Sequence, residues 1–210
     1  EISACLVGSE MCIRDRFNSM ETEKIVAAYL QHIPVEVLEK AKKIKVLITD
    51  VDGVLTDGGI LYDNEGMEYK KYNVKDGLIV QHLKKAGFLV GAITGRASQV
   101  VENRCEELRF DFHYHGVKDK YKKLAELLET MELTLEEVAY LGDDLIDLPV
   151  LTKVGLSIAP ADALPYVCAA VDYVSPFAGG KGVFREAADL LLHAKGQLIP
   201  LIELFAKKEA

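Results

Sequence analysis

Asp50-Val51-Asp52-Gly53-Val54-Leu55-Thr56-Asp57 decides the fold, together with the apolar run at residues 44–49 that comes directly before it. A short β-branched run that ends in acidic residues and glycine predicts a buried parallel strand running into a loop. Ligands bind at the carboxyl ends of such strands. One of the paired carboxylates, Asp50 and Asp52, could attack an electrophile while the other transfers protons. Because clustered acids repel, Mg²⁺ is their natural partner; a plain Asp-Gly turn is the alternative.

The bulk composition is that of one ordinary globular domain. The chain has 210 residues, 50% of them hydrophobic and 28% charged, which is enough to bury a single core. Its net charge of −8 argues against nucleic acid or an anionic membrane as a partner, although a small anionic substrate could still bind a few local cations. No apolar run approaches the roughly 20 residues that span a membrane.

The first 16 residues do not resemble the rest of the chain, and they look like a translated sequencing adapter. We expect Met20 to be the natural start. Of the remaining chain, only Cys105 and Cys168 carry thiols, which indicates a reducing cytoplasm and no disulfide framework. The expected segments are a non-native stretch at 1–19, a helical extension at 20–43, a catalytic domain at 44–195, and a C-terminal tail or helix at 196–210.

Apolar strands alternate with amphipathic helices along the chain. This pattern predicts an α/β fold: a Rossmann-like, doubly wound parallel sheet with helices on both faces. A short β-hairpin insertion is expected at 59–72, around Asp63-Asn64-Glu65-Gly66. Strands are expected at 45–49, 88–93, 110–114, 138–141, 154–158 and 172–174, and helices at 22–41 (broken at Pro34), 77–86, 97–108, 119–131, 144–151 and 182–193.

Polar residues follow four of the predicted strands, and a parallel sheet would bring them to one edge. Their types suit phosphoryl transfer, which needs an in-line nucleophile and neutralised phosphate oxygens. Asp50 would attack phosphorus, and Asp52 would protonate the leaving alkoxide and then deprotonate water. Thr94 and Lys120 would bind phosphate, and Asp143 would hold Mg²⁺ with Asp50 and the Asp52 carbonyl. Taken singly, Thr94 could be only a helix cap and Lys120 only a solvated residue.

The segment from Asp50 to Thr56 resembles the nucleophile motif of the haloacid dehalogenase superfamily of phosphatases. Over about residues 45–195, further motifs resemble one family within it, the 3-deoxy-D-manno-octulosonate 8-phosphate (Kdo-8-phosphate) phosphatases of lipopolysaccharide synthesis. These motifs are Tyr72-Asn73-Val74-Lys75-Asp76-Gly77, Ile93-Thr94-Gly95-Arg96, Ala139-Tyr140-Leu141-Gly142-Asp143-Asp144-Leu145-Ile146-Asp147, Gly155-Leu156-Ser157-Ile158, Ala161-Asp162-Ala163-Leu164-Pro165 and Gly179-Gly180-Lys181-Gly182.

The resemblance implies a Mg²⁺-dependent phosphatase without a cap domain, usually a homotetramer, that acts on a small anionic sugar phosphate. It implies substrate contacts at Asn73, Val74, Lys75, Asp76, Gly77, Gly95, Arg96, Arg104 and Lys120. Two alternatives stay open. One is a phosphatase of another keto-acid sugar phosphate, such as a nine-carbon 9-phosphate, and the other is a non-catalytic, phosphatase-like regulator of a cytidylyltransferase.

Three further features yield expectations. The apolar hairpin invites pairing with another subunit. The glycine-rich loop at 175–182 is expected to reach a neighbouring subunit's site, with Lys181 facing the substrate carboxylate, although it could be only a linker. His113 and His115 are interpreted as packing or surface residues, and Cys105 as inert.

Overall fold

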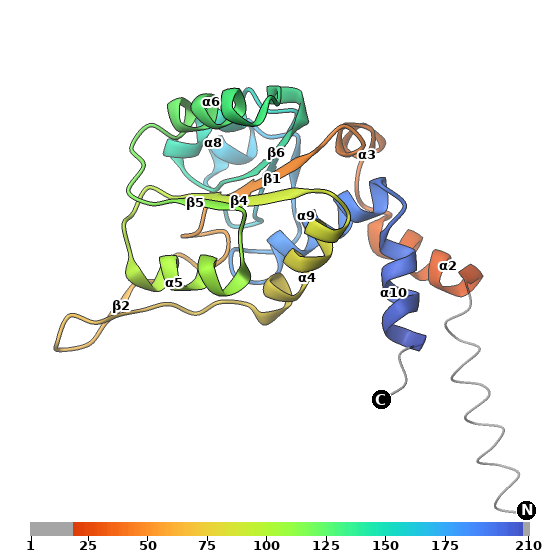
Figure 1. The fold of residues 1–210 in the computed structure, drawn as a ribbon, viewed down its shortest axis with the longest axis horizontal. Helices are drawn as coiled ribbons and strands as arrows, with labels where there is room; N and C mark the ends of the chain where they lie inside the picture. The colour runs from red at the N-terminus through yellow and green to blue at the C-terminus, as the bar shows by residue number, and fades with distance from the viewer. Residues whose placement is uncertain (1–18, 208–210) are drawn as a thin grey trace, which may run out of the picture.

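The computed structural model of the chain describes residues 19–207, so the expected non-native stretch lies almost wholly outside the described residues. Its centre is a six-stranded parallel sheet in the order β5-β4-β1-β6-β7-β8 (Figure 1). The strands are β1 (Val46–Thr49), β4 (Leu89–Ile93), β5 (Phe112–Tyr114), β6 (Val138–Leu141), β7 (Leu156–Ala159) and β8 (Tyr173–Val174). The predicted α/β fold is confirmed, with every expected strand present.

The sheet is buried on both faces because its strands are apolar throughout rather than alternating. In β1, Leu47 packs into the core beneath one layer of helices, while Val46 and Ile48 pack into the core on the opposite face. The first layer contains α4 (Val74–Lys85), α5 (Gln99–Leu108) and α9 (Val183–Ala194). The second contains α6 (Lys120–Met131), α7 (Leu148–Leu151) and α8 (Pro165–Cys168). Figure 1 shows the two layers on opposite sides of the sheet.

Two helix starts differ from the sequence prediction for identifiable reasons. Helix α4 begins at Val74 rather than Gly77, because the Asn73 side chain accepts a hydrogen bond from the Lys75 N–H and caps the helix there. The predicted helix at 144–151 is a 3₁₀ turn, η3 (Leu145–Asp147), followed by α7. A second 3₁₀ turn, η2 (Leu135–Glu137), precedes β6.

The insertion after β1 is a small hairpin of β2 (Leu61–Tyr62) and β3 (Glu68–Tyr69), which are antiparallel. It projects from the body of the molecule (Figure 1). Its apolar side chains are exposed, with Leu61 65% and Met67 59% accessible. The hairpin therefore leaves an apolar surface uncovered in the single chain.

The two ends of the described chain pack together. Helix α2 (Ser19–Leu30) lies beside α10 (Leu198–Lys207), and α3 (Val35–Ala41) packs on α9. The predicted break at Pro34 is present, and Pro34 is the N-cap of α3. Within residues 19–207, no helix combines the length and the apolar character needed to cross a bilayer.

Candidate active site

The floor of the site is a buried cluster of one lysine and two aspartates. Lys120 Nζ lies 2.9 Å from Asp50 Oδ2 and 2.7 Å from Asp147 Oδ1. Lys120 is only 1% exposed, so the reading of it as a solvated helix residue is wrong. Asp119 caps α6, and the buried face of that helix, which carries Leu124, places the lysine over the end of β1.

Asp147 organises this floor. Its Oδ1 also accepts a hydrogen bond from Tyr140 Oη at 2.7 Å, and its Oδ2 accepts the backbone N–H groups of Asp143 and Asp144, each at 3.3 Å. Sequence reasoning included Asp147 in a family motif but did not assign it this role. The Asp147 carboxylate therefore ties Lys120 and the loop after β6 to Tyr140 on β6.

Above the floor is an open cavity of about 360 Å³ at the carboxyl edge of the sheet. Thr94 reaches it at the end of β4, where its backbone is held by Tyr114 and Val117. The cavity is lined by Asp50, Asp52, Gly53, Gly58, Thr94, Gly95, Arg96, Asp143, Asp144 and Ile146. The structure therefore brings together most of the catalytic and metal-binding residues predicted from the sequence, with Lys120 beneath them.

A group of carboxylate oxygens makes this cavity suitable for a hard cation. Asp50, Asp143 and Asp147 each offer an oxygen within 4.8 Å of the others, and Asp50 Oδ1 and Asp143 Oδ1 are buried with no hydrogen-bond partner among the described residues. Gly53 lies at φ +84°, and a Cβ there would come within 2.1 Å of Asp143 Oδ2, so only glycine lets the chain pass this close. Buried carboxylates without donors are costly unless a cation neutralises them, and oxygen ligands are those that Mg²⁺ prefers. The donor set fits Mg²⁺.

The electrostatics agree with this fit. Burial, with the neighbouring Asp50 and Asp147, raises the pKa of Asp143 to about 7. Burial also raises the pKa of Asp50, against the pull of Lys120. For Lys120 burial acts to lower the pKa, but Asp50 and Asp147 outweigh it and keep the ammonium charged. A divalent cation beside Asp50 and Asp143 would hold both as carboxylates.

A second ionic set forms the rim between the cavity and the hairpin. Lys70 Nζ lies 2.5 Å from Asp52 Oδ1 and 3.2 Å from Glu68 Oε1. Arg96 is 3.2 Å from Glu68 and 3.7 Å from Asp52, and Ser98 donates to Glu68 at 2.8 Å. Sequence reasoning missed Lys70 and Glu68. Their signal was weak, because alternating charge on a hairpin is equally typical of a solvated strand.

Three of the other predicted substrate contacts, Asn73, Asp76 and Arg104, line a second, small crevice. Asp76 is buried and accepts the backbone N–H of Arg185 at 3.0 Å, and burial raises its pKa to about 6. The Arg104 guanidinium lies over the ring of Tyr72 and beside Gly77. Leu55, Tyr72, Asn73, Asp76, Arg104 and Leu108 line this crevice. Val74 and Lys75 are exposed at the start of α4.

The glycine-rich loop contacts its own chain. A Cβ on Gly179 would lie 2.1 Å from the carbonyl oxygen of Gly53, and Gly180 N donates to Val54 O at 2.9 Å. The loop therefore packs against the segment that follows β1, which a flexible linker would not do. Lys181 itself is exposed.

The fold and this site define a haloacid dehalogenase-like hydrolase, and the model of that family matches residues 114–186. Among curated proteins, the 3-deoxy-D-manno-octulosonate 8-phosphate phosphatase of Escherichia coli K12 is 46% identical over 166 residues, which are 79% of this chain and 88% of that protein. This chain belongs to the family of 3-deoxy-D-manno-octulosonate 8-phosphate phosphatases.

Solved structures agree. The Moraxella catarrhalis enzyme, crystallised with magnesium, phosphate and Kdo, superposes with a TM-score of 0.79 at 38% identity, covering 81% of this chain and 98% of that one. The cobalt-bound Haemophilus influenzae enzyme gives 0.73 at 42% identity, covering 76% and 93%. The resemblance predicted from the sequence is confirmed, and the chain is a phosphatase.

Proposed function

We propose that this protein hydrolyses 3-deoxy-D-manno-octulosonate 8-phosphate to Kdo and phosphate in lipopolysaccharide biosynthesis, with Mg²⁺ as its cofactor. The observation that carries the proposal is the arrangement of Asp50 against Lys120, with unpartnered oxygens of Asp50, Asp52 and Asp143 facing one cavity. The relatives named above are enzymes of this activity, and one was crystallised with magnesium, phosphate and Kdo.

The residues suit a two-step transfer. Asp50 Oδ1, which has no partner among the described residues, attacks phosphorus, and the alkoxide leaves with a proton from Asp52. Asp52 then takes a proton from water, whose oxygen attacks the aspartyl-phosphate, releasing phosphate and restoring the Asp50 carboxylate. Lys120 and Thr94 hold the phosphate oxygens. Bound Mg²⁺, held by Asp50, the Asp52 carbonyl and Asp143, would neutralise charge on the phosphate.

Asp52 has two oxygens in different surroundings. Oδ1 pairs with Lys70, whereas Oδ2 is buried and has no hydrogen-bond partner among the described residues. Oδ2 is therefore the oxygen available to carry the proton. Lys70 fixes the rotamer through Oδ1, which keeps Oδ2 aimed at the reacting oxygen.

The predicted substrate-binding residues suit an acidic sugar. Arg96 and Arg104 can each bind a carboxylate or hydroxyl groups through a planar guanidinium, and both lie beside the cavity or the small crevice. Gly95 offers a backbone N–H beside Thr94. We include Asn73, Val74, Lys75, Asp76 and Gly77, at the start of α4, as the second wall of the substrate site.

Two alternatives predict different results. A phosphatase for a nine-carbon keto-acid phosphate would use the same catalytic floor and differ only in how the sugar is bound. A non-catalytic regulator of a cytidylyltransferase would have no need for the Asp50–Lys120–Asp147 floor, and the intact floor favours an enzyme.

A screen of sugar phosphates tests the proposal. Purified protein is incubated with Mg²⁺ and Kdo-8-phosphate, a nine-carbon 9-phosphate, or simple hexose phosphates, and released phosphate is measured. We expect the highest kcat/KM on Kdo-8-phosphate, loss of turnover in EDTA, and recovery with Mg²⁺. Preference for the nine-carbon substrate would assign the first alternative, and no turnover on any substrate would assign the second.

We also propose a homotetramer whose active sites are completed by neighbouring subunits. The exposed apolar side chains of Leu61, Tyr62 and Met67 support it, because burying them between subunits would cover an aggregation-prone hairpin. Lys181, exposed at the end of an anchored loop, could then face a neighbour's substrate. Light scattering on a size-exclusion column tests this, and a fully active monomer at nanomolar concentration would contradict it.

We propose a cytoplasmic location. Cys105 and Cys168 are both unpaired thiols, as is usual for proteins of a reducing compartment. Fractionation of cells, with activity assayed in each fraction, tests this assignment.

A further inference from the structure

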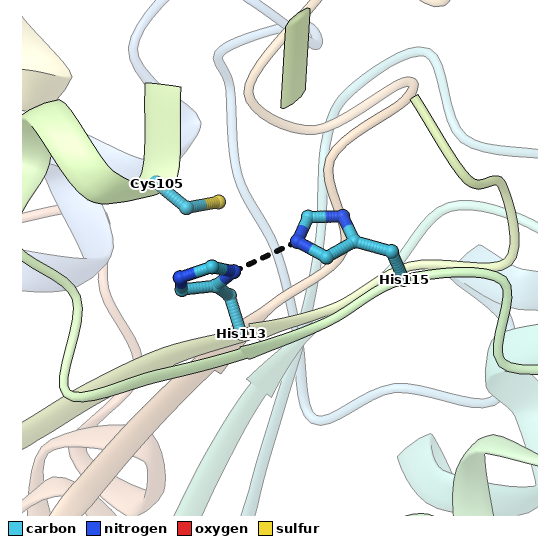
Figure 2. A group of neighbouring side chains, drawn as sticks. All are labelled: Cys105, His113 and His115. Carbon is cyan, nitrogen blue, oxygen red and sulfur yellow. Dashed lines mark hydrogen bonds between the residues drawn. The ribbon is translucent and has the colours of Figure 1, made fainter. Parts of the chain in front are cut away.

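A cluster of one thiol and two imidazoles lies at the edge of the sheet, apart from the catalytic carboxylates. His113 lies on β5, and His115 comes directly after the end of that strand. The two residues are two positions apart, so they share one face of the extended chain. Cys105 comes from α5, which covers that face. Figure 2 shows the sulfur pointing toward the two rings. Sequence reasoning treated these three residues separately, because nothing in their spacing places a helix residue over a later strand.

The three side chains are close enough to share one ion. One potential ligand atom from each residue lies within 4.8 Å of the others. His113 Nδ1 and His115 Nε2 form a hydrogen bond of 2.8 Å. Two nitrogens bound to one tetrahedral zinc lie roughly 3.3 Å apart, so the rings need to separate by only about 0.5 Å. A bond to the cation would replace the hydrogen bond between them.

The burial of this cluster favours the binding of a metal ion. Cys105 is 1% exposed. His115 Nδ1 is buried and has no hydrogen-bond partner among the described residues. A buried polar nitrogen normally has a partner, so the present orientation of the His115 ring leaves one polar atom unsatisfied, and the ring can gain a partner for it by turning when a metal binds.

Glu102 adds a negative charge near the cluster. It lies one helical turn before Cys105 on α5, and it is half-buried. Its carboxylate is not among the ligand atoms that lie within 4.8 Å of one another. Its charge acts on Cys105 and His115 and would favour a bound cation over an empty site.

We propose that Cys105, His113 and His115 form a second metal site that binds Zn²⁺, with water in the fourth position of a tetrahedral set. Sulfur and imidazole ligands favour zinc, whereas Mg²⁺ prefers oxygen, so the chain separates the two cations by donor type. The Cys105 proton leaves to solvent when its sulfur binds the ion. The bound ion would tie α5 to β5 and so fix the helix that carries Arg104.

Cobalt substitution tests the site on the full chain. The protein is freed of metal, saturated with Mg²⁺ to fill the carboxylate site, and titrated with Co²⁺, while thiolate-to-cobalt charge-transfer absorption is recorded. We expect one equivalent to produce this band in the wild type, and Zn²⁺ to abolish it by displacement. Absence of the band in the wild type would overturn the proposal.

Matched variants assign the ligand. Cys168→Ser alters the other thiol of the described chain, which is half-buried near Ala163, and should keep the band. Cys105→Ser should lose it. A band that persists in Cys105→Ser would assign the thiolate to another cysteine, including Cys5 or Cys12, and would overturn the site.

A wild-type measurement covers the case in which Cys105→Ser does not fold. X-ray absorption at the zinc edge, on protein loaded with one equivalent of Zn²⁺ in excess Mg²⁺, should show one sulfur at about 2.3 Å and nitrogen at about 2.0–2.1 Å. A shell of nitrogen and oxygen alone would contradict the proposal. We also expect zinc to raise the Tm of the wild type but not of a folded His115→Gln variant.

Discussion

Two ionic clusters meet at the carboxyl edge of the sheet, and they differ in burial. The floor, Asp50–Lys120–Asp147, is almost wholly withdrawn from water. The rim, Lys70–Glu68–Arg96, joins the core to a hairpin that projects into solvent, and it is only partly buried: the Lys70 side chain is 0%, Glu68 13% and Arg96 39% exposed. Breaking a buried pair leaves an uncompensated charge and is strongly destabilising, whereas a pair with an exposed member, such as Arg96 with Glu68, contributes less. The comparison predicts that the floor controls chemistry and stability and that the rim tunes substrate affinity.

The largest effect is expected from removing the nucleophile. Asp50→Asn should lower kcat by on the order of 10⁴-fold or more, because a neutral amide cannot attack phosphorus, while circular dichroism stays that of a folded protein. Asp57→Asn is the matched control, since Asp57 belongs to the same motif but is exposed. Wild-type turnover in folded Asp50→Asn would remove Asp50 from the mechanism.

A smaller loss of activity is expected when Asp147, which holds Lys120 in place, is neutralised. Asp147→Asn should lower the free energy of unfolding by about 3 kcal/mol, because Lys120 keeps its charge but loses one of two carboxylates. It should also lower kcat by roughly 10²-fold through misplacement of Lys120. Urea unfolding and steady-state kinetics measure both effects. The control is Asp144→Asn at an exposed position, and equal losses in the two variants would show that the floor is not special.

The burial of Asp76 can be tested through the pH dependence of the free energy of unfolding. Its folded pKa is raised to about 6 by burial, so its contribution to stability is fully present below its unfolded pKa and is lost as pH rises through 6. Asp76→Asn keeps an acceptor for the Arg185 N–H but cannot ionise. Relative to wild type, the variant should therefore gain up to about 3 kcal/mol between pH 4 and pH 8. Parallel stability curves in urea would contradict a raised pKa.

The smallest effect is expected at the rim. Glu68→Gln weakens the contacts with Lys70 and Arg96, so KM should rise by at most about tenfold, with kcat nearly unchanged and stability altered by about 1 kcal/mol or less. Glu65→Gln, at the exposed hairpin turn, is the control. A fall in kcat as large as that of Asp147→Asn would show that Lys70 needs Glu68 in order to position Asp52, and would erase the distinction between the two clusters.

The sequence alone predicted the strands and the polar residues that follow them. An apolar run such as residues 44–49 can be satisfied only by burial on both faces, and parallel strands place their carboxyl ends on one edge. Asp50, Thr94 and Asp143 are therefore neighbours for reasons visible in the chain itself. The assignment of Lys120 depended on the whole set of polar residues that follow the strands, because a lysine at a helix start is otherwise typical of a solvated residue.

The tertiary structure decided which side chains touch across those loops. Lys70 reaches Asp52 from a hairpin 18 positions along the chain, Asp147 holds Lys120, and Cys105 meets His113 and His115 over the sheet. Local propensity and periodicity say which face a residue occupies, but not which residue from another element will lie opposite. That choice depends on strand register and on how the helices pack, and these follow from the whole core rather than from any one segment.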